Sequence, residues 1–148
     1  MRIYANVRLQ GANNESVENA IIDTGAEISL MPSRIAVNIG AWCTNQQMNV
    51  VGVHGEARTL PIIVAHLHFP ALNDVGGQFA FVMSNTEREL LIGMDILNPL
   101  GITIDTQTHQ LSIKNEIWEA FKTLAAVGVI IYGGVKLLEA LSEPRELR

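Results

Sequence analysis

The sequence predicts a mainly β domain, built as a closed barrel or a sandwich of short strands, followed by one α-helix. Short apolar segments recur between turn-forming residues through the first two thirds of the chain, as in closed or sandwiched β-domains. Residues 116–141 contain no proline and carry apolar residues at alternating steps of four and three, the period of a packed helix. Hydrophobic residues make up 48% of the 148 residues and charged residues only 17%, which supports a packed core rather than disorder.

The strands follow from local patterns. Residues 3–10 alternate between apolar side chains at odd positions and mostly polar ones at even positions, which predicts a half-buried strand. Residues 11–15 (GANNE) form a turn cluster before a second strand at residues 17–22. Further strands are expected at residues 47–53, 58–67, 77–83, 90–92, 102–105 and 110–113. Short helices are expected at residues 32–39, where Pro32 suits a first helical turn, and at residues 94–100.

The C-terminal helix divides the chain into a β-domain, residues 1–114, and a helical extension, residues 115–148. Its heptad positions are Ile117, Phe121, Leu124, Gly128, Ile131, Val135 and Leu138. We favour a helix that packs on its symmetry mate or on the β-domain and so strengthens self-association. Two alternatives place residues 116–141 in contact with a membrane or with another partner. Only thirteen uncharged residues separate Lys122 from Lys136, whereas a membrane span needs about 20 residues.

Composition argues against several classes of function. The net charge of -5 gives no basic surface for nucleic acid, so no nucleic-acid partner is expected. The single cysteine, Cys43, cannot form an internal disulfide, and a cytoplasmic location is expected, with membrane association through the C-terminal helix as the alternative. His66 and His68 share one face of a predicted strand, but zinc would require a third ligand. No metal and no cofactor are therefore expected.

The segment Ile21-Ile22-Asp23-Thr24-Gly25 is the part of the sequence most indicative of a catalytic function. An apolar strand delivers an acid, a hydroxyl and a glycine onto a tight loop, where glycine allows backbone and substrate to approach closely. An ordinary turn could also contain this tripeptide. The apolar strand before it, with Ala26 and Ser29 after it, favours a functional loop over a chance turn.

Three segments together resemble the retropepsin-like family of aspartic peptidases, over about residues 1–113. They are IIDTGAEIS (residues 21–29), VVGVHGEAR (residues 50–58) and LLIGMDILNPLGITID (residues 90–105), in the order in which the family carries its catalytic loop, flap hairpin and apolar-apolar-glycine motif. The resemblance implies a closed β-barrel or sandwich subunit with a short helix after the LLIG motif.

The resemblance also implies roles for individual residues. Asp23 would be the catalytic carboxylate, Thr24 would hold the catalytic loops of two subunits together, and Gly25 would line the substrate backbone. The residues implied to contact substrate are Ala26, Glu27, Gly52, Val53, His54, Gly55 and Ile92. Gly52 to Gly55 would form the flap tip. Ile92, together with Gly93, would pack behind the catalytic loop.

One catalytic motif per chain implies a homodimer. Aspartic peptidases need two carboxylates that share a proton, one to activate water and one to polarise the scissile carbonyl. The near copy Asp105-Thr106-Gln107 lacks the glycine, so we interpret Asp105 as a structural or surface acid. The sequence therefore predicts an aspartic endopeptidase that hydrolyses a peptide or protein substrate with Asp23 from each of two subunits. The alternatives are a non-catalytic dimeric peptide-binding scaffold of the same fold and a membrane-anchored regulatory peptidase.

Overall fold

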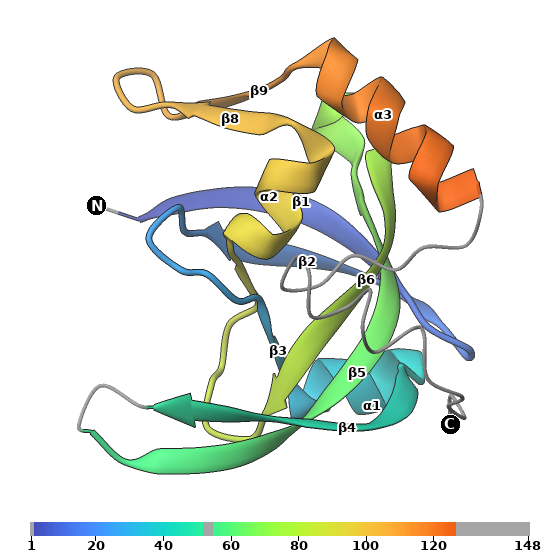
Figure 1. Ribbon diagram of the computed structural model, residues 1–148, viewed down its shortest axis with the longest axis vertical. Coiled ribbons are helices and arrows are strands. Elements are labelled where there is room, and N and C mark those ends of the chain that lie inside the picture. Colours follow the sequence, from blue (N-terminus) through green and yellow to red (C-terminus); the bar gives the residue numbers. More distant parts are fainter. Residues whose placement is uncertain (1, 52–54, 127–148) are drawn as a thin grey trace.

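The computed structural model describes residues 2–51 and 55–126 (Figure 1). Its elements in chain order are β1 (Ile3–Gln10), β2 (Glu15–Ile22), β3 (Leu30–Pro32), α1 (Ser33–Ile39), β4 (Trp42–Val51), β5 (Ala57–Phe69), a 3-10 helix η1 (Pro70–Leu72), β6 (Val75–Ser84), β7 (Leu91–Ile92), α2 (Met94–Leu100), β8 (Ile102–Asp105), β9 (Gln110–Ile113) and α3 (Asn115–Ala126). The mainly β fold class predicted from the sequence is confirmed.

Seven strands form one sheet in the order β1-β2-β7-β3-β6-β5-β4. An additional antiparallel pairing of β1 with β5 brings the sheet back onto itself as a barrel-like ring. The ring is weakest between β3 and β7, where Leu30 and Leu91 are the one pair in register, so the barrel is not fully closed there. Strands β8 and β9 form a separate two-stranded sheet.

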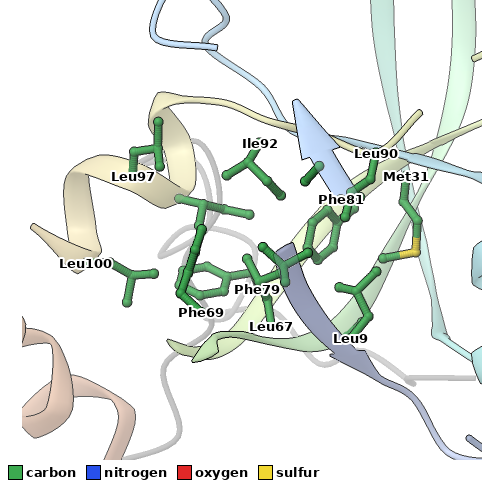
Figure 2. Close-up of a cluster of buried hydrophobic side chains, with 14 of the residues drawn as sticks. Leu9, Met31, Leu67, Phe69, Phe79, Phe81, Leu90, Ile92, Leu97 and Leu100 are labelled. Carbon is green, nitrogen blue, oxygen red and sulfur yellow. The ribbon is translucent and has the colours of Figure 1, made fainter. Parts of the chain in front are cut away.

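Side-chain alternation decides which face of each strand is buried. In β1, Val7 and Leu9 are fully buried, and in β2, Ala20 and Ile22 are buried at the same spacing of two residues. These apolar faces meet α2 and the long strands β5 and β6. Figure 2 shows Phe69 and Phe79 gathered with Leu97 and Leu100 of α2 in this core. The first two strands therefore present one face to the core and leave the other to solvent.

Two strand regions were not predicted correctly from the sequence. Strand β3 has only three residues, too few to show a period. Strand β4 begins at Trp42 rather than at residue 47, because its register with β5 shifts between Cys43 and Gln47. At this irregularity the Thr44 hydroxyl donates to the Ile62 carbonyl oxygen at 2.7 Å and accepts from the Gln46 N–H at 3.1 Å. Pro32, expected inside the first helix, is instead the extended residue that precedes α1.

The described part of the C-terminal helix, α3, packs on the β-domain. Phe121 is 2% exposed, and its ring stacks on Phe79 with the ring centres 5.4 Å apart and on Trp118 at 5.8 Å. The remaining heptad positions, from Gly128 onward, lie outside the described residues. Among the residues that the structure describes, no helix combines the length and apolar character needed to cross a membrane.

Candidate functional site

The loop of residues 23–29 joins β2 to β3 and carries Asp23 at its start. In Figure 1 this loop lies between the β8–β9 hairpin and the adjoining ends of β4 and β5, on the same side of the molecule. Parallel pairing of Ile22 with Ile92 brings β2 beside β7, and the Asp23 N–H donates to the Ile92 carbonyl oxygen at 2.9 Å. The end of β2, and with it the position of Asp23, is therefore fixed by β7.

The loop backbone orients the Asp23 carboxylate. The Gly25 N–H donates to Asp23 Oδ1 at 2.9 Å, and the Ala26 N–H donates to the Asp23 carbonyl oxygen at 3.2 Å. A Cβ atom on Gly25 would lie 3.2 Å from the same Oδ1, so a larger residue would crowd the carboxylate. Asp23 is half-buried, whereas Thr24 and Gly25 are exposed. The carboxylate is therefore held by the chain while the loop tip remains accessible.

Two surface hollows border Asp23. One has a volume of about 380 Å³ and is lined by Ile3, Ile22, Asp23, Thr24, Ile104, Thr106 and His109. The other, of about 180 Å³, is lined by Arg2, Ile21, Ile22, Asp23 and Leu91. Isoleucine and leucine side chains supply the apolar lining of both hollows, so an acid sits among groups suited to contact apolar side chains.

The N-terminal end of α2 supports the loop from behind. The Met94 N–H donates to the Ala26 carbonyl oxygen at 2.8 Å, and the Gly93 N–H donates to Ser29 Oγ at 2.9 Å. A Cβ atom on Gly93 would lie 2.7 Å from the Ala26 carbonyl oxygen and 3.0 Å from that of Ile28. Glycine is required here because the backbones approach too closely for any side chain.

Asp95 and Ser29 form a buried polar contact beneath the loop. The Ser29 hydroxyl donates to Asp95 Oδ1 at 2.6 Å, and the Ser29 N–H donates to Asp95 Oδ2 at 3.0 Å. Asp95 is 9% exposed, and Ser29 is fully buried. Burial raises the pKa of Asp95 above its ordinary value, although the hydrogen bonds from Ser29 act in the opposite direction.

The raised pKa of Asp95 predicts how its contribution to stability depends on pH. A carboxyl with a raised pKa in the folded state stabilises the fold in acid, and this contribution is lost as pH rises through the folded pKa. The free energy of unfolding of the native chain minus that of Asp95→Asn should therefore be largest in acid. It should fall as pH rises above about 3.9, the ordinary pKa of aspartate, and then level off. Urea unfolding of both chains, at one fixed protein concentration and at a series of pH values, measures this difference. A difference that grows with pH would contradict a raised pKa for Asp95.

The structure brings five of the expected site residues together on the loop, namely Asp23, Thr24, Gly25, Ala26 and Glu27. Ile92 requires a correction, because its side chain is fully buried and points into the core, so it supports the loop and does not reach substrate (Figure 2). Gly55 is exposed and has a φ of 78°, a conformation that suits glycine in a hairpin turn. Gly52, Val53 and His54 lie outside the described residues.

Several residues near Asp23 were missed from the sequence. Ser29 and Asp95 were not assigned to the site, although an acid within the apolar run LLIGMDIL is a signal of a buried polar contact. Arg2 and His109 border the two hollows. Nothing in their local sequence connects them to Asp23, because the fold joins segments far apart in the chain.

Asp105, the acid of the incomplete second motif, has a structural role at the end of β8. Its Oδ1 accepts hydrogen bonds from the Gln107 N–H at 2.8 Å and from the Thr108 N–H at 3.2 Å. These bonds lower the pKa of Asp105. They fix the turn of the β8–β9 hairpin, and Asp105 is exposed, in agreement with the interpretation of Asp105 as a structural or surface acid.

The two histidines of β5 lie away from the loop. The His66 ring packs edge-on against Trp42, with the ring centres 5.6 Å apart, and burial lowers the pKa of His68. Across residues 2–51 and 55–126, no group of three or more histidine, cysteine, aspartate and glutamate side chains gathers in a way that could hold a metal ion.

One family model and two solved structures match this chain. The sequence profile of the family described as "gag-polyprotein putative aspartyl protease" matches residues 9–99. The EIAV protease, solved in complex with the inhibitor HBY-793, superposes with a TM-score of 0.57 at 18% identity, over 71% of this chain and 93% of that chain. The retroviral protease-like domain of Ddi1 from Leishmania major superposes with a TM-score of 0.54 at 23% identity, over 78% of this chain and 89% of that chain. At these identities the two superpositions establish a shared fold. No curated protein sequence matches this chain significantly.

Proposed function

The chain belongs to the gag-polyprotein aspartyl protease family, a retropepsin-like family, and we propose that it is an aspartic endopeptidase that works as a homodimer. The observation that carries the proposal is the Asp23-Thr24-Gly25 loop at the end of β2. There the Gly25 N–H holds one oxygen of the Asp23 carboxylate at 2.9 Å, and a surface hollow opens beside that carboxylate.

The chemistry requires two Asp23 carboxylates close together. Two like charges at short range cannot both ionise easily, so the pair holds one proton between them. The ionised carboxylate takes a proton from a water molecule, whose oxygen attacks the carbonyl carbon of the scissile peptide bond. The protonated carboxyl donates its proton to the carbonyl oxygen. When the tetrahedral intermediate collapses, the C–N bond breaks and the departing amine takes up a proton from the carboxyl that received it. One hydroxyl of the intermediate returns its proton to the other carboxylate as the new carboxylic acid forms, so the pair again holds one proton.

A second copy of the chain is the proposed source of the second carboxylate. The one other Asp-Thr pair, Asp105-Thr106, is not proposed for this role, because Gln107 stands where the motif has its glycine and two backbone N–H groups bind the Asp105 carboxylate into its own hairpin turn. The surface around Asp23 also favours a second copy. Thr24 is exposed beside the larger hollow, and within the described residues β8 and β9 pair only with each other. Unpaired strand edges accept further strands, and a closed two-fold dimer is the commonest symmetric assembly.

The proposed substrate is an extended peptide that crosses the Asp23 loop. Gly25 and Glu27 are both exposed on the loop, where they can meet the main chain of a bound peptide. The aliphatic side chains around Asp23 favour apolar side chains next to the scissile bond.

The proposal is tested by cleavage of a mixed peptide library from about pH 4 to pH 7, with the oligomeric mass measured under the same conditions. Cleavage per subunit is expected to rise with protein concentration and to level off where the mass reaches that of a dimer. The rate should also fall at both ends of a bell-shaped pH profile, since one carboxylate must be ionised and the other protonated. Full activity at a concentration where the chain is monomeric would reject the homodimer, and a dimer that cleaves no peptide would favour the peptide-binding scaffold.

A further inference from the structure

Asp95 is a buried acid with a neutral partner. It lies in the first turn of α2 and is 9% exposed, yet no lysine, arginine or histidine among the described residues forms an ion pair with it. Both of its carboxylate oxygens are instead engaged by Ser29, one through the hydroxyl and one through the backbone N–H. A buried carboxylate costs free energy unless it is paired or hydrogen-bonded. The two hydrogen bonds from Ser29 therefore stabilise Asp95 in its buried position.

The hydrogen bonds run in one direction from the backbone to Asp95. The Gly93 N–H donates to Ser29 Oγ at 2.9 Å, and the same hydroxyl donates to Asp95 Oδ1 at 2.6 Å. The hydroxyl can serve both partners only while Asp95 presents an acceptor to it. The position of Ser29 is therefore tied to the chemical state of the Asp95 side chain.

Ser29 is the last residue of the loop that begins with Asp23. The segment of residues 92–95 contacts this loop at three points, namely at the Asp23 N–H, at the Ala26 carbonyl oxygen and at Ser29. The first two contacts are backbone to backbone and do not depend on side chains. The third consists of hydrogen bonds that each involve the Ser29 hydroxyl or the Asp95 carboxylate, so a substitution at either side chain weakens it.

We propose that Asp95 is a positioning residue for the proposed peptidase reaction, which holds the end of the Asp23 loop through Ser29 and so sets the geometry of the catalytic carboxylate. This inference rests on the proposed function. Asp95 does not touch the reacting atoms, because it is buried beneath the loop. It acts by limiting the positions available to the chain that carries Asp23 and Gly25.

Asparagine at position 95 would keep the shape of the side chain but replace one acceptor oxygen with a donor NH₂ group. Either the hydroxyl or the N–H of Ser29 would then lose its acceptor in a buried site, where an unsatisfied donor is costly. Displacement of a reacting group by about 1 Å can cost on the order of 100-fold in rate. We therefore expect Asp95→Asn to lower kcat by about 10-fold to 100-fold, with KM changed by less than about twofold.

The test compares Asp95→Asn with Ser29→Ala, Ser29→Thr and the double variant Ser29→Ala/Asp95→Asn. Ser29→Thr keeps a hydroxyl and should restore most of kcat, whereas Ser29→Ala should match Asp95→Asn. The double variant should be no slower than either single variant, because both act through one contact. Asp74→Asn is the matched control, since it makes the same exchange at an exposed carboxylate that pairs with Arg8. If each variant lowers only the unfolding temperature while kcat per folded dimer stays native, the positioning role is rejected.

A second measurement separates this inference from the proposed function. The Gly25 N–H donates to the Asp23 carboxylate, so its ¹H–¹⁵N NMR signal reports on the catalytic geometry without any substrate. This signal should shift in Asp95→Asn and Ser29→Ala but not in Asp74→Asn. If the native chain cleaves no peptide, a shift of the Gly25 signal still supports positioning by Asp95. An unchanged Gly25 signal in both site variants overturns the inference, whatever the activity.

Discussion

Subunits that carry Asp23→Asn are expected to cleave no peptide and to inactivate native subunits with which they assemble. An amide can neither take up the proton of the attacking water nor supply one to the scissile carbonyl. The loss for the pure variant should be about 1,000-fold or more, toward the upper range for removal of a general acid or base. The fold should be retained, because the side chains are nearly the same size and Asp23 is only half-buried.

Mixed assemblies distinguish a shared site from two separate ones. If native and variant chains are refolded together and pair at random, a mixture of equal parts contains about one quarter native–native dimers. Under the proposed mechanism, activity at a fixed total concentration falls with the square of the native fraction. Separate sites in each subunit would instead give a linear fall, to about one half at equal parts, and that result would reject the shared pair of carboxylates.

The mixing experiment has a control in the same chain. Subunits with Asp74→Asn lose a carboxylate on the connection between η1 and β6, outside both hollows that border Asp23. Mixtures of native subunits with this variant should keep full activity at every ratio. A fall of activity in the control would show that refolding, rather than the loss of a catalytic group, reduces the rate.

Gly93→Ala is expected to destabilise the chain by about 3 kcal/mol, near the upper end of the usual cost of overpacking. The added Cβ would lie 2.7 Å from the Ala26 carbonyl oxygen and 3.0 Å from the Ile28 carbonyl oxygen. Both obstructing atoms are backbone, so no side-chain rotation relieves the clash. Either α2 or the Asp23 loop must move, and movement of the loop should lower cleavage by about 100-fold.

Denaturant unfolding and cleavage by the same preparation measure the two effects of Gly93→Ala. Asn98→Ala is a suitable control, because it alters an exposed side chain on the same helix and should change stability by less than about 0.5 kcal/mol. A Gly93→Ala chain that unfolds at the native denaturant concentration and cleaves at the native rate would show that the close approach of the two backbones is not required.

Prediction succeeded for the helices and strands whose bounds depend on near neighbours in the sequence. The bounds of β1, α2, β8 and β9 match the expected ranges, because alternation, helical capping and turn residues act over a few positions. It failed where a distant segment decides the outcome. The short β3 exists because it lies between β6 and β7, and the start of β4 depends on its irregular register with β5.

By itself the sequence determined the mainly β fold and the loop that carries Asp23, since both follow from local patterns of apolar residues, glycine and acids. The need for a second carboxylate stays a prediction from the sequence. Only the tertiary structure decided what surrounds that loop. Asp95 reaches Ser29, and Arg2 and His109 line the hollows that border Asp23, because the fold brings together residues that lie more than twenty positions apart. Tertiary packing also decided that Ile92 faces inward, because β7 pairs with β2 and places this side chain in the core, where isoleucine gains free energy by leaving water.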